Sequence, residues 1–290
     1  MPVFRIASLF VVLSIFEHSF CAELSKEQLA FYRENGYLIQ QGFFQGEELD
    51  DLEHQIQIAL DSVAELPWSG NQSEEKLYLG GTLYVLGSVG QGSLPVIKRI
   101  VWAGAKFPEL LAYGRHPQLR KNVAQILDSS RATHLINQIH PKQPSDGVEY
   151  DVHRDIDNRR NFDKRWQDIK GNGSFVQTMA AIDRMGEDNG GLYVIPRSHH
   201  YCSPVKGNTV LGEEYRRELY GQKLPVIMNA GDMLYVHPCL VHFSGPNKSD
   251  KPRRLFINGY AYPGANHEPY PGTGSAQEID LVGSVQVMCW

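Results

Sequence analysis

The chain has 290 residues, of which 42% are hydrophobic and 21% are charged, and its formal net charge at pH 7 is -5. This is an ordinary globular composition with enough apolar residues to bury a large core. Because the sequence contains no long basic or acidic run, we expect neither nucleic acid nor an anionic membrane surface as a partner.

The first 21 residues have the pattern of a secretory signal peptide. Arg5 precedes an apolar run over residues 6–16, and Ser19-Phe20-Cys21 places small residues where a signal peptidase cleaves. The run is too short to span a bilayer comfortably, so we expect no stable membrane anchor. The alternative is an amphipathic or buried N-terminal helix. We therefore expect residues 22–290 to be secreted or held in the secretory pathway, and to be cytoplasmic if the leader is not cleaved.

The cysteines and sequons say little about export. Cleavage leaves Cys202, Cys239 and Cys289, an odd number that does not form a disulfide framework. Sequons, which permit glycosylation but often arise by chance, begin at Asn71, Asn172 and Asn247.

The N-terminal part of the chain is predicted to be mostly helical. Ser25 as N-cap and Gln28 three residues later predict a short helix that ends at Asn35-Gly36. A strand is expected at residues 37–39. The next helix has one apolar face, formed by Leu49, Leu52, Ile56 and Leu60. Two more helices are expected at residues 107–113 and 117–127.

Residues 67–95 are rich in glycine, serine and tyrosine. Such a stretch is either a mobile flap over a site or a plain irregular connection, and its position favours the flap. Side chains that could contact a substrate are Tyr78, Tyr84, Trp166 and the pair Arg159-Arg160.

The remainder of the chain predicts a mainly β fold with flanking helices. Short segments rich in β-branched and aromatic residues occur at residues 133–140, 175–183, 191–195, 224–228, 233–237, 240–243 and 254–262. They indicate a two-sheet jelly roll whose helices pack outside one sheet. We expect one domain over residues 22–290, with the jelly-roll core at about 133–263 and a C-terminal tail that wraps the surface or is loosely ordered.

Three side chains predict a metal site. In an extended segment, His153 and Asp155 leave the same face, and His242 would complete a set of three ligands. Two imidazoles and one carboxylate form the facial triad that holds non-haem Fe(II) and leaves positions open on one side. A solvated turn is the alternative for His153 and Asp155, and a core histidine is the alternative for His242.

The motifs together resemble a known family. His153-Arg154-Asp155, the run Asn189-Gly190-Gly191 to Ser198-His199, and His242 followed eleven residues later by Arg253 are similar to the phytanoyl-CoA dioxygenase-like (PhyH) family. The resemblance covers roughly residues 24–263. It implies a double-stranded β-helix, cupin-like in form, and an oxygenase that uses Fe(II), 2-oxoglutarate and O2, with ascorbate as a stimulant.

The resemblance also implies which residues bind the co-substrate. Arg253 stands at the family's spacing for the residue that holds the far carboxylate of 2-oxoglutarate, and a guanidinium suits that task. Leu255 occupies the position where the wider class often has a hydroxyl. Gln138 and Gln177 are candidates for further contacts, with an amide on the solvent face of a strand as the alternative.

The function expected from these residues is hydroxylation of a small-molecule substrate, with release of succinate and CO2. Two other classes use a similar scaffold: a non-catalytic secreted cupin-like binding protein and a zinc hydrolase. The identity of the substrate and the oligomeric state are not predicted.

Overall fold

The computed structural model describes residues 23–88, 95–157, 174–201, 221–265 and 270–282. The helices within these ranges are α1 (Lys26–Asn35), α2 (Gly46–Asp61), α3 (Pro108–Tyr113) and α4 (Pro117–Leu127), with a short 3-10 turn after α2 at Ser62–Glu65. Among the described helices, none has the length and apolar character needed to cross a membrane.

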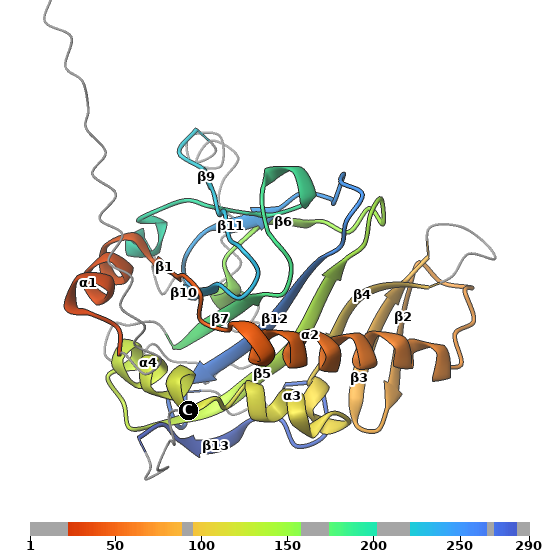
Figure 1. Ribbon diagram of the computed structural model, residues 1–290, viewed down its shortest axis with the longest axis horizontal. Coiled ribbons are helices and arrows are strands. Elements are labelled where there is room, and N and C mark those ends of the chain that lie inside the picture. Colours follow the sequence, from red (N-terminus) through yellow and green to blue (C-terminus); the bar gives the residue numbers. More distant parts are fainter. Residues whose placement is uncertain (1–22, 89–94, 158–173, 202–220, 266–269, 283–290) are drawn as a thin grey trace, which may run out of the picture.

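Two antiparallel sheets contain the described strands (Figure 1). The larger sheet has the order β1 (Tyr37–Gln40), β10 (Met233–Val236), β7 (Phe175–Ala181), β12 (Arg253–Ala261), β5 (Arg131–Lys142), β4 (Val96–Val101), β3 (Thr82–Gly87), β2 (Glu74–Leu79), with β13 (Gln277–Asp280) also paired to β5. The smaller sheet has the order β6 (Tyr150–His153), β11 (His242–Ser244), β8 (Leu192–Val194), β9 (Leu224–Pro225). This arrangement confirms the predicted jelly roll.

The large sheet separates two apolar cores. Along β12, Phe256 packs into the core shared with the helices, whereas Leu255 and Ile257 pack into the core between the two sheets. This alternation follows from the two-residue period of a strand. Leu52 and Ile56 of α2 join the helical core, which places the helix across the outer face of the large sheet (Figure 1). The helices therefore cover one face and leave the other for a site.

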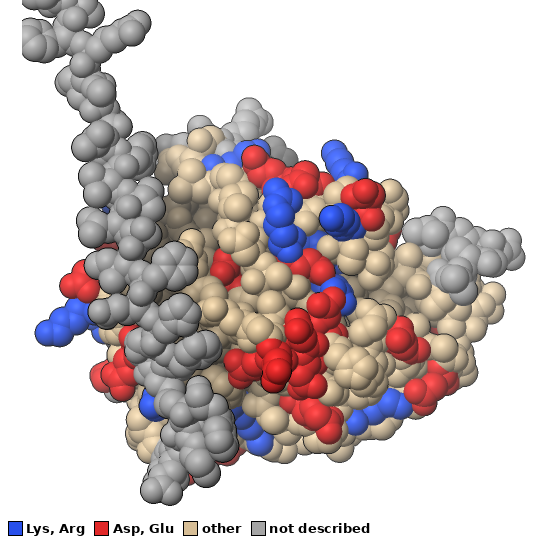
Figure 2. Space-filling view, in the orientation of Figure 1, with Lys and Arg blue, Asp and Glu red and all other residues tan. Residues whose placement is uncertain are grey.

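Local sequence signals explain the helix ends. Ser25 and Gln28 form a capping box at the start of α1, and Gly36 ends it with a φ of 81°. The apolar face of α2 is buried, and its acidic residues lie toward solvent, where they form the acidic surface at the centre of Figure 2. All four predicted helices are present.

The glycine-rich stretch forms a β-hairpin over residues 74–87, so the expectation of a flap or an irregular connection was wrong there, whereas residues 67–73 are an irregular connection. β2 and β3 are joined by Gly80 and Gly81, whose φ values of 58° and 87° fit a two-residue type I′ turn. β3 is buried along its whole length because both of its faces are covered. Gly80 and Gly81 therefore form the turn of a hairpin that extends the large sheet. Residues 89–94 lie outside the described ranges.

The C-terminal tail also contributes to the sheet. β13 pairs with the start of β5, from Gln277 beside His134 to Asp280 beside Arg131. The tail was expected to wrap the surface or to be loosely ordered, and part of it instead forms a regular strand of the large sheet. The predicted leader over residues 1–21 lies outside the described residues.

Candidate metal centre and its cavity

The three predicted ligands come together at one end of the small sheet. β6 and β11 are neighbours, and His153 lies directly opposite His242. Asp155 follows β6 at the start of a helical turn. The chain turns after His153 instead of continuing as a strand, so it is this turn, and not the expected extended spacing, that brings Asp155 to the two imidazoles.

The distances between these side chains suit a shared cation. Asp155 Oδ1 lies 3.6 Å from His153 Nε2 and 3.8 Å from His242 Nε2. One ligand atom from each residue lies within 4.8 Å of the others. Two nitrogens and one hard anionic oxygen form a donor set that suits Fe(II).

Backbone carbonyls fix both imidazole rings. His153 Nδ1 lies 2.6 Å from the carbonyl oxygen of Asp151, and His242 Nδ1 lies 3.0 Å from that of Leu240. A proton on each Nδ1 can be donated to these carbonyls, which leaves each Nε2 with its lone pair directed toward Asp155. In both histidines, the hydrogen bond from Nδ1 to the carbonyl oxygen of the residue two positions earlier thus turns Nε2 toward the candidate metal site.

The two histidines differ in their protonation. Burial and the neighbouring His153 lower the pKa of His242, which favours the neutral form that binds metals. Burial also opposes the charged form of His153, but its hydrogen bond to Asp155 and the charge of that carboxylate outweigh burial and raise its pKa. The carboxylate of Asp155 thus favours positive charge beside it, as it would favour a bound cation.

The three side chains form part of the wall of a cavity of about 150 Å³ between the two sheets. Apolar residues such as Ile136, Met179 and Leu192 line much of it. Its further polar lining comes from Arg99, Gln138, His140, Gln177, Ser244 and Arg253. A concave site in which polar groups converge between apolar side chains is the usual form of a small-molecule site, and this cavity is richer in polar groups than most.

Arg253 is a buried cation in this wall. Its side chain donates a hydrogen bond of 3.0 Å from one terminal nitrogen to the carbonyl oxygen of Gly190, and its Nε has no hydrogen-bond partner among the described residues. Burial lowers the pKa of Arg253 to about 10, so the group remains charged near neutral pH. A buried guanidinium with an unused donor fits an anionic ligand.

Both candidate glutamines face the cavity. Gln138 on β5 and Gln177 on β7 are 5% and 6% exposed, and both line its wall. Neither amide lies on a solvent face. Gln138 Oε1 has no hydrogen-bond partner among the described residues, so it is available to accept one from a ligand. Their contact with 2-oxoglutarate remains a prediction.

The sequence reasoning missed a second buried cation next to Arg253. Lys142 lies opposite Arg253 in the β5–β12 pair. Its Nζ donates to Ser244 Oγ at 2.7 Å and to the carbonyl oxygen of Gly245 at 2.6 Å. Burial, with a contribution from Arg253, lowers the pKa of Lys142 to about 7. The lysine ties β5 to the end of the strand that carries His242.

Other residues of the cavity were also missed or misplaced. Ser244, two positions after His242, could have been found from the two-residue period of a strand. Tyr78 and Tyr84 were expected to contact a substrate, but neither lines the cavity. Tyr84 is buried and hydrogen-bonded to Ser62, and Tyr78 is 61% exposed. The candidates Trp166 and Arg159-Arg160 lie outside the described residues.

A jelly roll with two histidines and an aspartate around one point in its cavity defines the class of cupin-like metal proteins. Residues 103–255, more than half of the chain, match the family model described as phytanoyl-CoA dioxygenase (PhyH). The chain belongs to this family.

One curated relative is the dioxygenase lolE1 of Epichloe uncinata, which is 27% identical over 89 residues. The aligned part covers 30% of this chain and 34% of that protein, so the chain matches about a third of its relative's length.

Similar solved structures confirm the fold. The structure of EctD from S. alaskensis with 2-oxoglutarate and 5-hydroxyectoine is 18% identical, with a TM-score of 0.66, and the match covers 90% of this chain and 84% of that one. The non-heme alpha ketoglutarate dependent carbocyclase SnoK from nogalamycin biosynthesis is 19% identical, with a TM-score of 0.60 and coverage of 89% and 95%. The implied double-stranded β-helix is therefore confirmed.

Proposed function

We propose that this protein is an Fe(II)- and 2-oxoglutarate-dependent dioxygenase that hydroxylates a small-molecule substrate and releases succinate and CO2. The observation that carries the proposal is the convergence of His153, Asp155 and His242 within 4.8 Å, in the wall of a cavity that also contains Arg253. Family membership supports the same chemistry. S. alaskensis EctD has also been solved with bound Fe.

His153, Asp155 and His242 are the residues that would hold the iron. All three donors come from one end of the small sheet and the turn after it, so they would occupy one side of the ion. The other side would face the cavity. When bound, ferrous iron with 2-oxoglutarate supplies the oxidising chemistry, in which O2 is consumed and the oxo acid is decarboxylated to succinate.

Arg253 would bind the carboxylate of 2-oxoglutarate that does not reach the metal. Its charge is buried, and its bond to Gly190 fixes one edge of the guanidinium while Nε remains available. The amides of Gln138 and Gln177 would supply further hydrogen bonds. Leu255 and Ile257, on the same face of β12 as Arg253, exclude water from the pocket and so strengthen these polar contacts.

The small size of the cavity supports a small-molecule substrate. Its volume is about 150 Å³, and it lies between the two sheets. The epimerase SnoN, a further structural relative, was solved with Fe3+, alpha ketoglutarate and nogalamycin RO.

A turnover assay tests this function. Purified protein is supplied with Fe(II), 2-oxoglutarate, ascorbate and candidate substrates, and succinate formation and O2 consumption are measured. The expected result is 2-oxoglutarate-dependent O2 consumption that Asp155→Ala abolishes. Hydrolytic activity with Zn2+ alone would instead identify a zinc hydrolase, and ligand binding without either reaction would identify a binding protein.

We further propose that residues 22–290 form one exported domain. The leader pattern supports export, and so does Cys239, which is disulfide-bonded. The other cysteines, Cys21, Cys202 and Cys289, lie outside the described residues. Disulfides persist mainly in oxidising compartments. N-terminal sequencing of the protein purified from its host tests this: a mature N-terminus near residue 22 is expected, and an intact leader would contradict it.

A further inference from the structure

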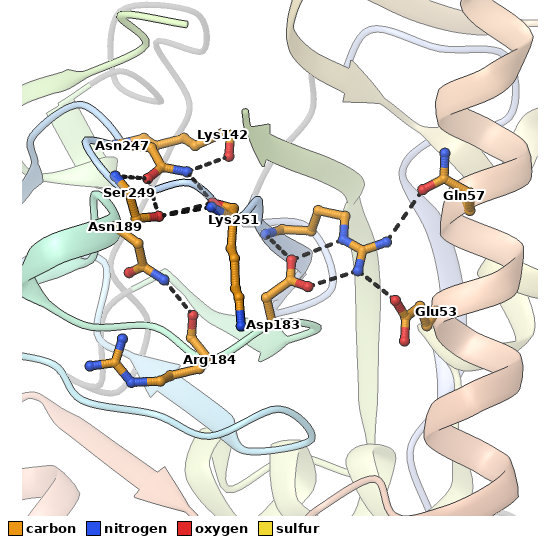
Figure 3. Close-up of polar contacts among 10 residues, drawn as sticks. Glu53, Gln57, Lys142, Asp183, Arg184, Asn189, Asn247, Ser249 and Lys251 are labelled. Carbon is orange, nitrogen blue, oxygen red and sulfur yellow. Dashed lines mark hydrogen bonds and ion pairs between the residues drawn. The ribbon is translucent and has the colours of Figure 1, made fainter. Parts of the chain in front are cut away.

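Lys142 is a buried lysine to which the proposed reaction gives no role. It ends β5, where it lies opposite Arg253 of β12, and its side chain does not line the cavity. Asn247 donates a 3.0 Å hydrogen bond to the backbone carbonyl oxygen of Lys142 (Figure 3). Strand pairing and this bond together fix the lysine next to Arg253.

The amino group of Lys142 lies among oxygen acceptors at the end of the small sheet. Its Nζ lies 2.7 Å from Ser244 Oγ, 2.6 Å from the carbonyl oxygen of Gly245 and 3.3 Å from that of Gly190. The carbonyl oxygen of Ser244 is further away, at 3.5 Å. An ammonium group has three protons to donate, whereas a neutral amine has two. The arrangement of acceptors therefore suits the charged form, although the site is buried.

The carbonyl oxygen of Gly190 accepts hydrogen bonds from both Lys142 and Arg253. Gly190 has a φ of 75°, and a Cβ there would lie 2.9 Å from the backbone nitrogen of Asn247 and the carbonyl oxygen of Gly245. The backbone around this oxygen is thus tightly packed. Because one oxygen serves both cations, the position of Lys142 also determines how Arg253 is held.

The charges of the two side chains are also coupled. Burial, and then the charge of Arg253, lower the pKa of Lys142 to about 7. The charged and titratable groups that face Lys142 are Arg253 on β12, His140 on β5, Tyr150 on β6, and Asp146 and Glu149 between β5 and β6. The two carboxylates favour the ammonium form but do not restore its ordinary pKa. An anion bound beside Arg253 would offset the repulsion between the two cations.

We propose that Lys142 is a positioning residue for 2-oxoglutarate, which holds Gly190 and the end of β11 so that Arg253 faces the co-substrate, and which takes up a proton when this dianion binds. The inference rests on the proposed function, because that function assigns the far carboxylate to Arg253. The proton comes from the solvent, since both carboxylates of 2-oxoglutarate are already ionised near neutral pH. Affinity should therefore fall as the pH rises through the value at which Lys142 of the free protein titrates, and level off once the complex also loses this proton.

Proton uptake in the wild-type protein tests the inference. 2-Oxoglutarate is titrated calorimetrically, without oxygen, into the Fe(II)-loaded protein at pH 6.5, 7.5 and 8.5, in two buffers of different ionisation enthalpy. We expect uptake of about half a proton per 2-oxoglutarate at pH 7.5 and less at the other two values, as for a complex that holds the proton about tenfold more strongly than the free protein. The metal is bound beforehand, so His153 and His242 contribute no proton.

A variant assigns the proton to Lys142. Lys142→Met keeps a side chain of similar length without the charge, and it should bind 2-oxoglutarate about tenfold more weakly than the wild type at pH 6.5. At pH 8.5 the difference should shrink to less than about twofold, because the wild-type lysine is then mostly neutral in both states. A role in packing alone would weaken binding equally at each pH. Lys251→Met, at an exposed position nearby, should keep the wild-type affinity and uptake.

Three results would overturn the inference: the wild type binds 2-oxoglutarate without proton uptake, Lys142→Met takes up as many protons as the wild type, or the ratio of the two affinities does not change with pH. The second result would assign the proton to another group, such as His140. Iron content and circular dichroism check that Lys142→Met keeps its metal site and fold. If the variant does not fold, the wild-type uptake and its maximum near pH 7.5 decide alone. Failure of the proposed function gives a different result, because the Fe(II)-loaded wild type would then bind no 2-oxoglutarate at any pH.

Discussion

Arg253 and Arg254 are adjacent in β12, yet their guanidinium groups lie on opposite faces of the large sheet. Arg253 reaches the cavity and the carbonyl oxygen of Gly190. Arg254 donates from Nε and one terminal nitrogen to the two oxygens of Asp183, at 2.9 and 2.7 Å, and also pairs with Glu53 of α2 at 2.6 Å (Figure 3). One arginine is thus available for a ligand, and its neighbour anchors the strand.

Replacement of Arg253 should weaken the binding of 2-oxoglutarate. Arg253→Gln removes the buried charge that would pair with the far carboxylate, so we expect affinity to fall by about 30-fold or more. Calorimetric titration of 2-oxoglutarate into the Fe(II)-loaded protein, without oxygen, measures the change. Lys251→Gln, which removes an exposed charge nearby, is the control. Unchanged affinity in Arg253→Gln would rule out this arginine as the anchor.

Replacement of Arg254 should reduce stability instead. Arg254→Gln leaves Asp183, whose side chain is 19% exposed, without its two-point ion pair, and we expect a loss of about 3 kcal/mol in the free energy of unfolding. Urea denaturation measures this. Arg184→Gln is the matched control, because Arg184 and Asp188 are 58% and 59% exposed and such a pair contributes below about 1 kcal/mol. Equal losses in the two variants would contradict the anchoring role.

The metal site should depend on Asp155. Asp155→Ala removes the only anionic donor of the cluster, so we expect loss of tight Fe(II) binding and at least a 100-fold loss of 2-oxoglutarate turnover with the fold retained. Metal content after dialysis, succinate formation and circular dichroism measure these effects. Asp151→Ala, which alters an exposed carboxylate on the same segment, should leave all of them unchanged. Wild-type iron content in Asp155→Ala would show that the carboxylate is not a ligand.

The sequence predicted the helices and the strands of the core because their signals are local. The cap at Ser25 and the apolar spacing of α2 require no knowledge of distant residues. Arg99 could not be assigned to the cavity, because no strand was predicted at residues 96–101 and because only the pairing of β4 with β5 places that strand in the wall. The burial of Lys142 beside Arg253 likewise depends on the register of β5 and β12. Local chemistry thus predicted which three side chains come together as candidate ligands, and tertiary pairing determined the rest of the wall.

The sequons should differ in glycosylation if the chain is exported. Asn71 is exposed, whereas Asn247 is 1% exposed and its amide nitrogen donates to the carbonyl oxygens of Lys142 and Lys251 (Figure 3). A glycan on Asn247 would break these bonds, so the folded protein should carry a glycan on Asn71 and none on Asn247. Glycopeptide mass spectrometry of the secreted protein checks this, with Asn71→Gln as the control that loses the glycan. A folded protein glycosylated at Asn247 would contradict the structure.

Lys142 should make stability depend on pH above neutrality. Its pKa is lowered to about 7 in the folded protein, whereas the exposed side chain of the unfolded chain has its ordinary value near 10.5. Between these values the unfolded chain binds more protons, so this group makes the folded state more stable as the pH rises, by up to about 1.4 kcal/mol per pH unit. Lys142→Met removes the contribution. Urea denaturation at pH 7, 8 and 9 should therefore show the stability of the wild type increasing relative to Lys142→Met, and Lys251→Met, at an exposed position, should show no such trend. A constant difference between the wild type and Lys142→Met across this range would show that the buried ammonium keeps its ordinary pKa.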